Sequence, residues 1–158
     1  MSQVDNRRVL IVVPCGSAKV WDKHPDAGPT PARDAYVGSP FKVNREYALR
    51  FANTWVVLSA KYGFLLPDDV VLGPYNVTFK RPSTHPIEVE AMRRQVPARG
   101  LDRYDVVVGL GGKDYRSIVE DVFASTGVTL HFPFAGMKLG VALGATKRAT
   151  AAGHFVER

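Results

Sequence analysis

The chain has 158 residues, of which 46% are hydrophobic and 23% are charged, as expected for a globular protein with a real core. Its single cysteine, Cys15, excludes an internal disulfide and a multi-cysteine zinc site. No apolar run approaches the roughly 20 residues of a membrane helix, and MSQVDNRR is not followed by a signal-type apolar segment. We therefore expect a single domain over residues 1–158 in the cytoplasm, without a membrane partner.

The chain is basic, with a net charge of +6 and an isoelectric point near 9.6. This charge favours polyanionic partners such as nucleic acid or nucleotides. Many basic soluble proteins bind no nucleic acid, so the charge alone leaves both outcomes open.

Four short apolar runs predict buried strands, and they lie at residues 8–13, 55–58, 104–110 and 128–132. Between them the pattern predicts helices at residues 39–51 and 86–96, a helix carrying Tyr115–Phe123, and a last helix to about Thr150. In the last helix, Gly140 and Gly144 suggest close packing on one face. Residues 20–39 and 65–82 have no periodicity and predict loops and turns.

Strands that alternate with helices predict an α/β fold with three layers, α/β/α, around a small, mainly parallel, Rossmann-like sheet of about four strands. The carboxyl ends of parallel strands meet at one edge, where ligands bind in such folds. Three of the four loops at this edge contain a lysine. The candidate binding residues in these loops are Cys15, Gly16, Ser17, Lys19, Ser59, Lys61, Tyr62, Gly111, Gly112, Lys113, Tyr115, Phe134, Gly136 and Met137.

Several of these residues have two interpretations. The loop Gly109–Asp114 suits a phosphate at a helix N-terminus, but it is equally a tight turn, since it matches no nucleotide-binding signature. Cys15 is a nucleophile or, more simply, a small buried residue; no histidine is predicted beside it as a base. Four aromatic residues either stack a base or fill a core, namely Trp21, Tyr62, Tyr75 and Phe134.

Asp34 lies in the long loop and is a candidate catalytic carboxylate, or a structural partner of Arg33. Lys61 is a candidate for catalysis or for an anionic ligand, or a structural partner of Asp34. No cluster of histidine and carboxylate residues has the spacing of a metal site. We therefore expect neither a metal nor another cofactor.

The blocks PCGSAK, PARDAYVGSPFK, LSAKYGFLLPDD, PYN, GGKDY and PFAGMKLG together resemble an uncharacterised family of small bacterial and phage proteins. That family is distantly similar to the YaaA peroxide-stress proteins and to α/β domains of the uracil-DNA-glycosylase class, so the resemblance implies a glycosylase-like version of the fold. The chain lacks the Gly-x-Asp-Pro-Tyr and late His-Pro-Ser motifs of uracil-DNA glycosylases. The positions that match the family's blocks are Cys15, Ser17, Lys19, Asp34, Tyr36, Lys61, Tyr62, Tyr75, Tyr115 and Gly136.

From these features we expect a protein that binds a nucleotide or nucleobase and cleaves or exchanges an N-glycosidic bond. Such a protein is a hydrolase, and Asp34 is the carboxylate expected to stabilise the charge that develops in the reaction. An alternative is a non-catalytic nucleic-acid-binding module, which the helical residues Arg93, Arg94, Lys147 and Arg148 favour. A third hypothesis is a redox or acyl-transfer enzyme that depends on Cys15. The sequence does not indicate the oligomeric state.

Overall fold

The computed structural model describes residues 6–157, so the first five residues of MSQVDNRR lie outside the described part. Five strands form the main sheet in the order β4-β3-β1-β6-β7. Four of them are parallel, namely β1 (Val9–Pro14), β3 (Thr54–Ser59), β6 (Val106–Gly109) and β7 (Thr129–His131). The predicted α/β fold with a mainly parallel sheet is confirmed.

The fifth strand, β4 (Gly63–Leu65), runs antiparallel to β3 and was not predicted. A turn at residues 60–62 reverses the chain, and Gly63 there has a φ of 74°, which glycine adopts without strain. The sequence predicts a loop here because the strand after the turn is only three residues long.

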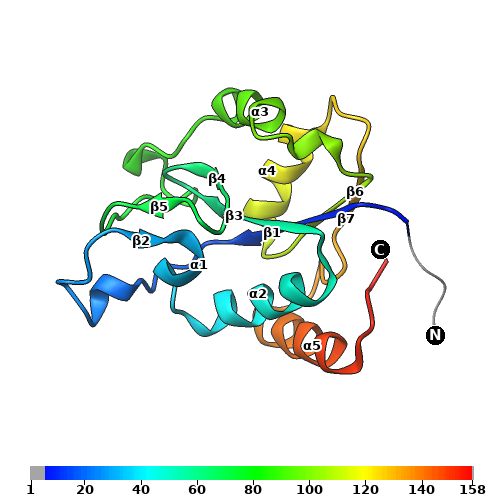
Figure 1. Cartoon of the computed structure of the whole chain (residues 1–158), viewed down its shortest axis with the longest axis horizontal. Helices are drawn as coiled ribbons and strands as arrows, with labels where there is room; N and C mark the ends of the chain where they lie inside the picture. The colour runs from blue at the N-terminus through cyan, green and yellow to red at the C-terminus, as the bar shows by residue number, and fades with distance from the viewer. Residues whose placement is uncertain (1–5, 158) are drawn as a thin grey trace.

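Helices cover both faces of the sheet (Figure 1). On one face lie α2 (Ser39–Phe51) and α5 (Leu139–Ala152), and on the other lie α3 (Val89–Ala98) and α4 (Lys113–Phe123). β1 shows why both faces are covered, since its alternate side chains belong to two separate buried clusters, one against each helical layer. Three of the four apolar runs were therefore read correctly as strands buried on both sides, namely β1, β3 and β6. The fourth, β7, lies at the edge of the sheet and is exposed or half-buried along its length.

Residues 20–39 and 65–82 are not featureless. The first region holds a 3₁₀ turn, η1 (Val20–Asp22), strand β2 (Thr30–Pro31) and helix α1 (Ala32–Ala35). Strand β5 (Val70–Val71) pairs with β2 in a small separate sheet. Two more 3₁₀ turns, η2 (Pro82–Thr84) and η3 (Leu101–Arg103), flank α3.

The expected close packing at Gly140 and Gly144 is wrong. A side chain at Gly140 would meet no atom within 4 Å, and one at Gly144 would meet only Arg148 of the same helix. The buried face of α5 instead carries Thr146 and Ala149, which are 2% and 8% exposed. Glycine spacing indicated a face of the helix, but not the face that packs.

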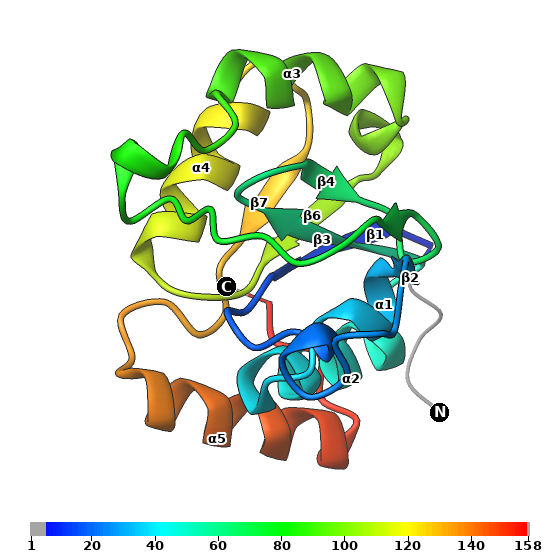
Figure 2. The same ribbon diagram turned by 90° about the vertical axis from the view of Figure 1, so that its left-hand side faces the viewer.

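The connections leave β1 and β6 in opposite directions. The chain passes from β1 through α2 to β3 on one side, and from β6 through α4 to β7 on the other. The switch point of the topology therefore lies beyond the carboxyl ends of β1 and β6, where α/β proteins hold their ligands. Figure 2 views the molecule from this edge. Within residues 6–157, no helix has the length and apolar character needed to cross a membrane.

Candidate functional site

A crevice of about 260 Å³ opens at the switch point, and we call it the Lys19 crevice. The loop after β1 forms one wall, the segment around Tyr75 forms another, and α4 contributes Tyr115. The crevice is lined by Cys15, Gly16, Ser17, Lys19, Asp22, Tyr75, Asn76, Val77, Thr78 and Tyr115.

Lys19 is the charged centre of this crevice. It is 7% exposed, and its Nζ lies 4.4 Å from the centre of the Tyr75 ring and 3.3 Å from the carbonyl oxygen of Ser17. Within the described chain it forms no ion pair. Burial lowers the pKa of the Lys19 ammonium, although Cys15 and Asp22 partly offset this effect.

A chain of hydroxyl groups holds Tyr75 in place. The Tyr75 hydroxyl hydrogen-bonds to the hydroxyl of Tyr36 and, at 2.8 Å, to Ser59 Oγ. Ser59 Oγ also accepts the backbone N–H groups of Lys61 and Tyr62, at 3.2 and 3.1 Å. Because Tyr36 is 1% exposed, burial raises its pKa to about 12, and burial likewise raises the pKa of Tyr75. This network fixes one wall of the crevice before any ligand arrives.

Lys61 and Tyr62 surround the same ring. Lys61 Nζ lies 5.6 Å from the centre of the Tyr75 ring, and the Tyr62 and Tyr75 rings meet edge to face at 5.5 Å. Lys19 and Lys61 thus approach a single aromatic ring from loops 42 positions apart in the sequence. The predicted convergence of these two lysines is present, and a positive region surrounds Tyr75.

Cys15 lies beside Tyr115 rather than beside a base. Its Sγ is 3.6 Å from the Tyr115 hydroxyl, whose pKa is raised by burial and by the neighbouring Cys15. The crevice lining contains no histidine. A thiolate mechanism would need such a base, so the geometry agrees with the structural interpretation of Cys15. The described chain also holds no group of three or more His, Cys, Asp or Glu placed to bind a metal.

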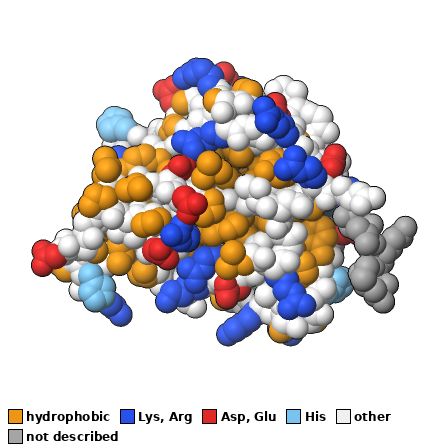
Figure 3. All heavy atoms as spheres, viewed as in Figure 1, with side chains coloured by type: hydrophobic (Ala, Val, Ile, Leu, Met, Phe, Trp, Pro, Cys, Tyr) orange, Lys and Arg blue, Asp and Glu red, His pale blue; other side chains and the backbone are white. Residues whose placement is uncertain are grey.

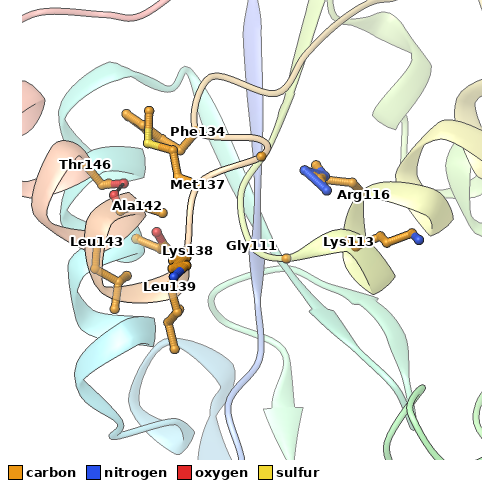
Figure 4. A pocket seen from close by; sticks show the side chains of 13 residues that line it. Gly111, Lys113, Arg116, Phe134, Met137, Lys138, Leu139, Ala142, Leu143 and Thr146 are labelled. Carbon is orange, nitrogen blue, oxygen red and sulfur yellow. Dashed lines mark hydrogen bonds between the residues drawn. The ribbon is translucent and has the colours of Figure 1, made fainter.

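A second cavity, the α4–α5 pocket, opens at the same edge with a volume of about 330 Å³ (Figure 4). It contains six of the predicted residues, namely Gly111, Gly112, Lys113, Phe134, Gly136 and Met137. In Figure 4 the Arg116 side chain extends toward the α5 wall, whereas the Lys113 side chain points away from it. Lys113 therefore contributes to the pocket chiefly through its backbone. The remaining lining residues are Asn44, Arg116, Lys138, Leu139, Ala142, Leu143 and Thr146.

The two cavities are neighbours across the first turn of α4, with Tyr115 lining the crevice and Gly112 lining the pocket. Gly111 has a φ of 102°, and a side chain at this position would come within 2.7 Å of Pro14 Cγ. The loop before α4 therefore passes close against the end of β1. Only glycine permits this approach.

Asp34 lies apart from both cavities. It is exposed on α1, forms a 3.6 Å ion pair with Arg33 and lines neither the crevice nor the pocket. This placement matches the structural interpretation of Asp34, as a partner of Arg33. Tyr36 and Tyr62 also line neither cavity, but both contact Tyr75 and support it from behind the wall.

Several lining residues were not predicted, although most of them carry a signal in the sequence. Asn76 belongs to the PYN block and Lys138 to the PFAGMKLG block. Arg116 follows Gly112 by one helical turn and therefore shares its face. Asn44 interrupts the otherwise apolar face of α2, which is a detectable sign of a special role. Asp22 had no such signal, because the turn at residues 20–22 has no periodicity.

Comparison with known proteins gives a family but no activity. Residues 10–148 match a family of unknown function, DUF6884, and the chain belongs to this family. The uncharacterized protein YfjM of Bacillus subtilis (strain 168) is 40% identical over 146 residues, which cover 92% of this chain and 97% of YfjM. No solved structure matches the chain.

Proposed function

We propose that the protein binds a nucleotide or nucleobase at the carboxyl edge of its sheet, with the base in the Lys19 crevice. The observation that carries this proposal is the largely buried Lys19 at the switch point, whose ammonium contacts the Ser17 carbonyl oxygen and the Tyr75 ring but has no ion-pair partner in the described chain. A charged group that has lost most of its hydration is unfavourable unless a partner compensates it. A ring nitrogen, carbonyl or phosphate oxygen of a nucleotide supplies such a partner.

The rest of the crevice suits a planar heterocycle. The rings of Tyr75 and Tyr115 provide flat apolar surface, and base–aromatic contacts contribute about 1–3 kcal/mol each. Asn76 and Asp22 provide an amide and a carboxylate of the kind that read base edges. Because the hydroxyl network holds Tyr75 rigidly, little entropy is lost when a ligand enters.

The alternative of a non-catalytic nucleic-acid-binding module requires a continuous basic surface. Arg93 and Arg94 lie on α3, whereas Lys147 and Arg148 lie on α5, on the opposite face of the sheet. Figure 3 shows Lys and Arg side chains over both layers, with acidic side chains between them. The nucleotide proposal therefore has the stronger support.

Cleavage of an N-glycosidic bond is a further proposal, and it is favoured by Asp22 rather than Asp34. Asp22 lines the crevice, and its Oδ2 accepts the backbone N–H of Lys19 at 2.9 Å. In this reaction the bond between the sugar and the base breaks and water adds to the sugar carbon. The base leaves with a proton, and a carboxylate stabilises the positive charge that develops on the sugar.

Isothermal titration calorimetry with nucleoside monophosphates, nucleosides and free bases tests the binding proposal. We expect at least one of these ligands to bind, and the Lys19→Met variant to bind it at least tenfold more weakly. Lys23→Met is the matched control because Lys23 is exposed outside the crevice, and it should bind as the wild type does. Binding of no ligand in the panel, or equal binding by Lys19→Met, would contradict the proposal.

The cleavage proposal is tested by measuring, with chromatography, the free base that is released from the bound ligand. We expect Asp22→Asn to lower turnover at least 100-fold while ligand binding persists. Asp34→Asn should match the wild type, since Asp34 lines neither cavity. Loss of turnover in Asp34→Asn with retention in Asp22→Asn would instead support the assignment made from the sequence.

A further inference from the structure

We infer that the α4–α5 pocket binds a phosphate group, so that the ligand of the Lys19 crevice is a phosphorylated nucleoside rather than a free base. This inference rests on the proposed function, but the pocket itself can be tested separately. Three independent features of the pocket support it: two helix N-termini, unpaired cations and a buried amide without a partner.

Two helices begin at the rim of the pocket. α4 starts after Gly112 and α5 starts after Lys138, and neither helix has a side-chain cap. The first amide groups of each helix therefore have no intrahelical acceptor. Together with the helix dipoles, they favour a negative charge at this position.

The side chains around these helix ends are cationic. Arg116 and Lys138 belong to the lining, which contains neither aspartate nor glutamate. Lys113 is also a lining residue, but its side chain points away from the α5 wall. None of the three forms an ion pair with a residue in the described chain. Arg116 extends from α4 toward the α5 wall and carries the planar guanidinium that binds phosphate oxygens in pairs.

Asn44 provides the observation that points most directly to a ligand. It lines the pocket from α2 and is 6% exposed, yet its side-chain amide has no hydrogen bond to any residue in the described range. Among described residues, the only polar side-chain atom that is sealed from solvent without a partner is His131 Nε2. The Asn44 amide is therefore not sealed; it opens into the pocket. An amide that faces the pocket without a protein partner is free to donate its N–H to a ligand oxygen.

The position of the pocket fits a nucleotide that occupies both cavities. Tyr115 in the crevice and Gly112 in the pocket lie three residues apart on the first turn of α4. One turn of helix rises about 5.4 Å, which is comparable to the length of a sugar. A base beside Tyr75 and a phosphate at the N-terminus of α4 are thus compatible with one ligand.

The test is a titration of the full chain with inorganic phosphate alone, monitored by ¹H–¹⁵N NMR. We expect phosphate to shift the backbone signals of Gly112 and Lys113 and the side-chain amide signals of Asn44, while chloride at equal ionic strength leaves them in place. Arg116→Met and Asn44→Leu should each weaken phosphate binding at least tenfold. Arg94→Met on α3 is the matched control and should not change phosphate binding. If Asn44→Leu does not fold, the result with Arg116→Met decides whether the pocket binds phosphate.

A nucleoside and its monophosphate, compared by calorimetry, separate this inference from the proposed function. Tighter binding of the monophosphate, at least tenfold and lost in Arg116→Met, supports both. Equal binding of nucleoside and monophosphate with no effect of Arg116→Met overturns the phosphate site but leaves the crevice. Phosphate binding without any nucleoside binding leaves the phosphate site and removes the proposed function. Phosphate shifts no larger than those with chloride overturn the inference.

Discussion

The Lys19 crevice and the α4–α5 pocket lie at the same edge of the sheet but are built in different ways. The crevice depends on side chains that hold one another, through the contacts of Tyr36, Tyr75 and Ser59 around Lys19. The pocket depends on backbone geometry, because a glycine-containing loop brings the uncapped N-terminus of α4 opposite that of α5. The polar groups of the crevice are largely hydrogen-bonded to one another or to neighbouring backbone groups. In the pocket the Asn44 amide has no hydrogen-bond partner and Arg116 no ion-pair partner in the described chain, whereas the Thr146 hydroxyl donates to the carbonyl oxygen of Ala142.

This difference implies different sensitivities. Side-chain substitutions should damage the crevice and leave the pocket intact, because the hydroxyl network is confined to one wall. Changes to the loop between the two cavities should damage both. The following predictions separate these cases, from the largest expected effect to the smallest.

Gly111→Ala should disturb both cavities. The new side chain would approach Pro14 Cγ to 2.7 Å at a φ of 102°, so the loop must move. Strain at positive φ and overpacking together should lower the free energy of unfolding by about 3 kcal/mol. Chemical denaturation measures this change. Gly127→Ala, where a side chain meets no atom within 4 Å, is the control and should stay within about 0.5 kcal/mol. Equal stability of the two variants would mean that the loop is not constrained as described.

Ser59→Ala should damage the crevice alone. Ser59 is fully buried, and the substitution removes the hydrogen-bond partner of the Lys61 and Tyr62 N–H groups and one partner of the Tyr75 hydroxyl. We expect a loss of about 2 kcal/mol in the free energy of unfolding and weaker nucleotide binding, with phosphate binding unchanged. Ser125→Ala, at an exposed position, should change neither. Loss of phosphate binding in Ser59→Ala would show that the two cavities are not independent.

Lys19→Met should raise stability while it removes ligand binding. Removal of a largely buried charge that has no ion-pair partner in the described chain should increase the free energy of unfolding by about 1 kcal/mol at neutral pH. The folded-state pKa of Lys19 lies below its ordinary value of 10.5, so the stability of the wild type rises as pH increases toward 10.5. The advantage of the variant should therefore shrink over that range. Thermal denaturation across pH measures it, and a constant difference would contradict the burial of the charge.

Ionisation of the tyrosine network should destabilise the protein only at high pH. Burial raises the pKa of Tyr36 from its ordinary 10.0 to about 12, so its contribution is fully present below pH 10 and is lost as pH rises through about 12. Absorbance of tyrosinate, recorded during an alkaline titration, should show late ionisation in the wild type. Tyr36→Phe should remove part of that late signal, and an unchanged titration curve would contradict this assignment.

Much of this architecture follows from local patterns in the sequence. Uniformly apolar runs such as residues 8–13 indicated buried parallel strands, and parallel strands place their following loops at one edge. The convergence of Lys19 and Lys61 follows from that topology alone. Strand β4 was missed because three residues carry too little periodicity to detect.

The division of the site into two cavities could not be predicted in the same way. It depends on how α5 packs against α2. Because of this packing, Asn44 and Thr146 line the pocket instead of lying in a closed core. The direction of a side chain could not be predicted either, since Lys113 lies in the expected loop but its side chain points away from the α5 wall. Asp34 matched a block of the family, but a matched position does not reveal whether its side chain reaches a cavity.

A crystal structure of the protein soaked with a nucleoside monophosphate tests the central claim most directly. Our account predicts a ring beside Tyr75 within reach of Lys19 Nζ, and a phosphate within hydrogen-bond distance of the first amide groups of α4. A nucleotide bound away from the carboxyl edge of the sheet, or both cavities empty at saturating ligand, would contradict it.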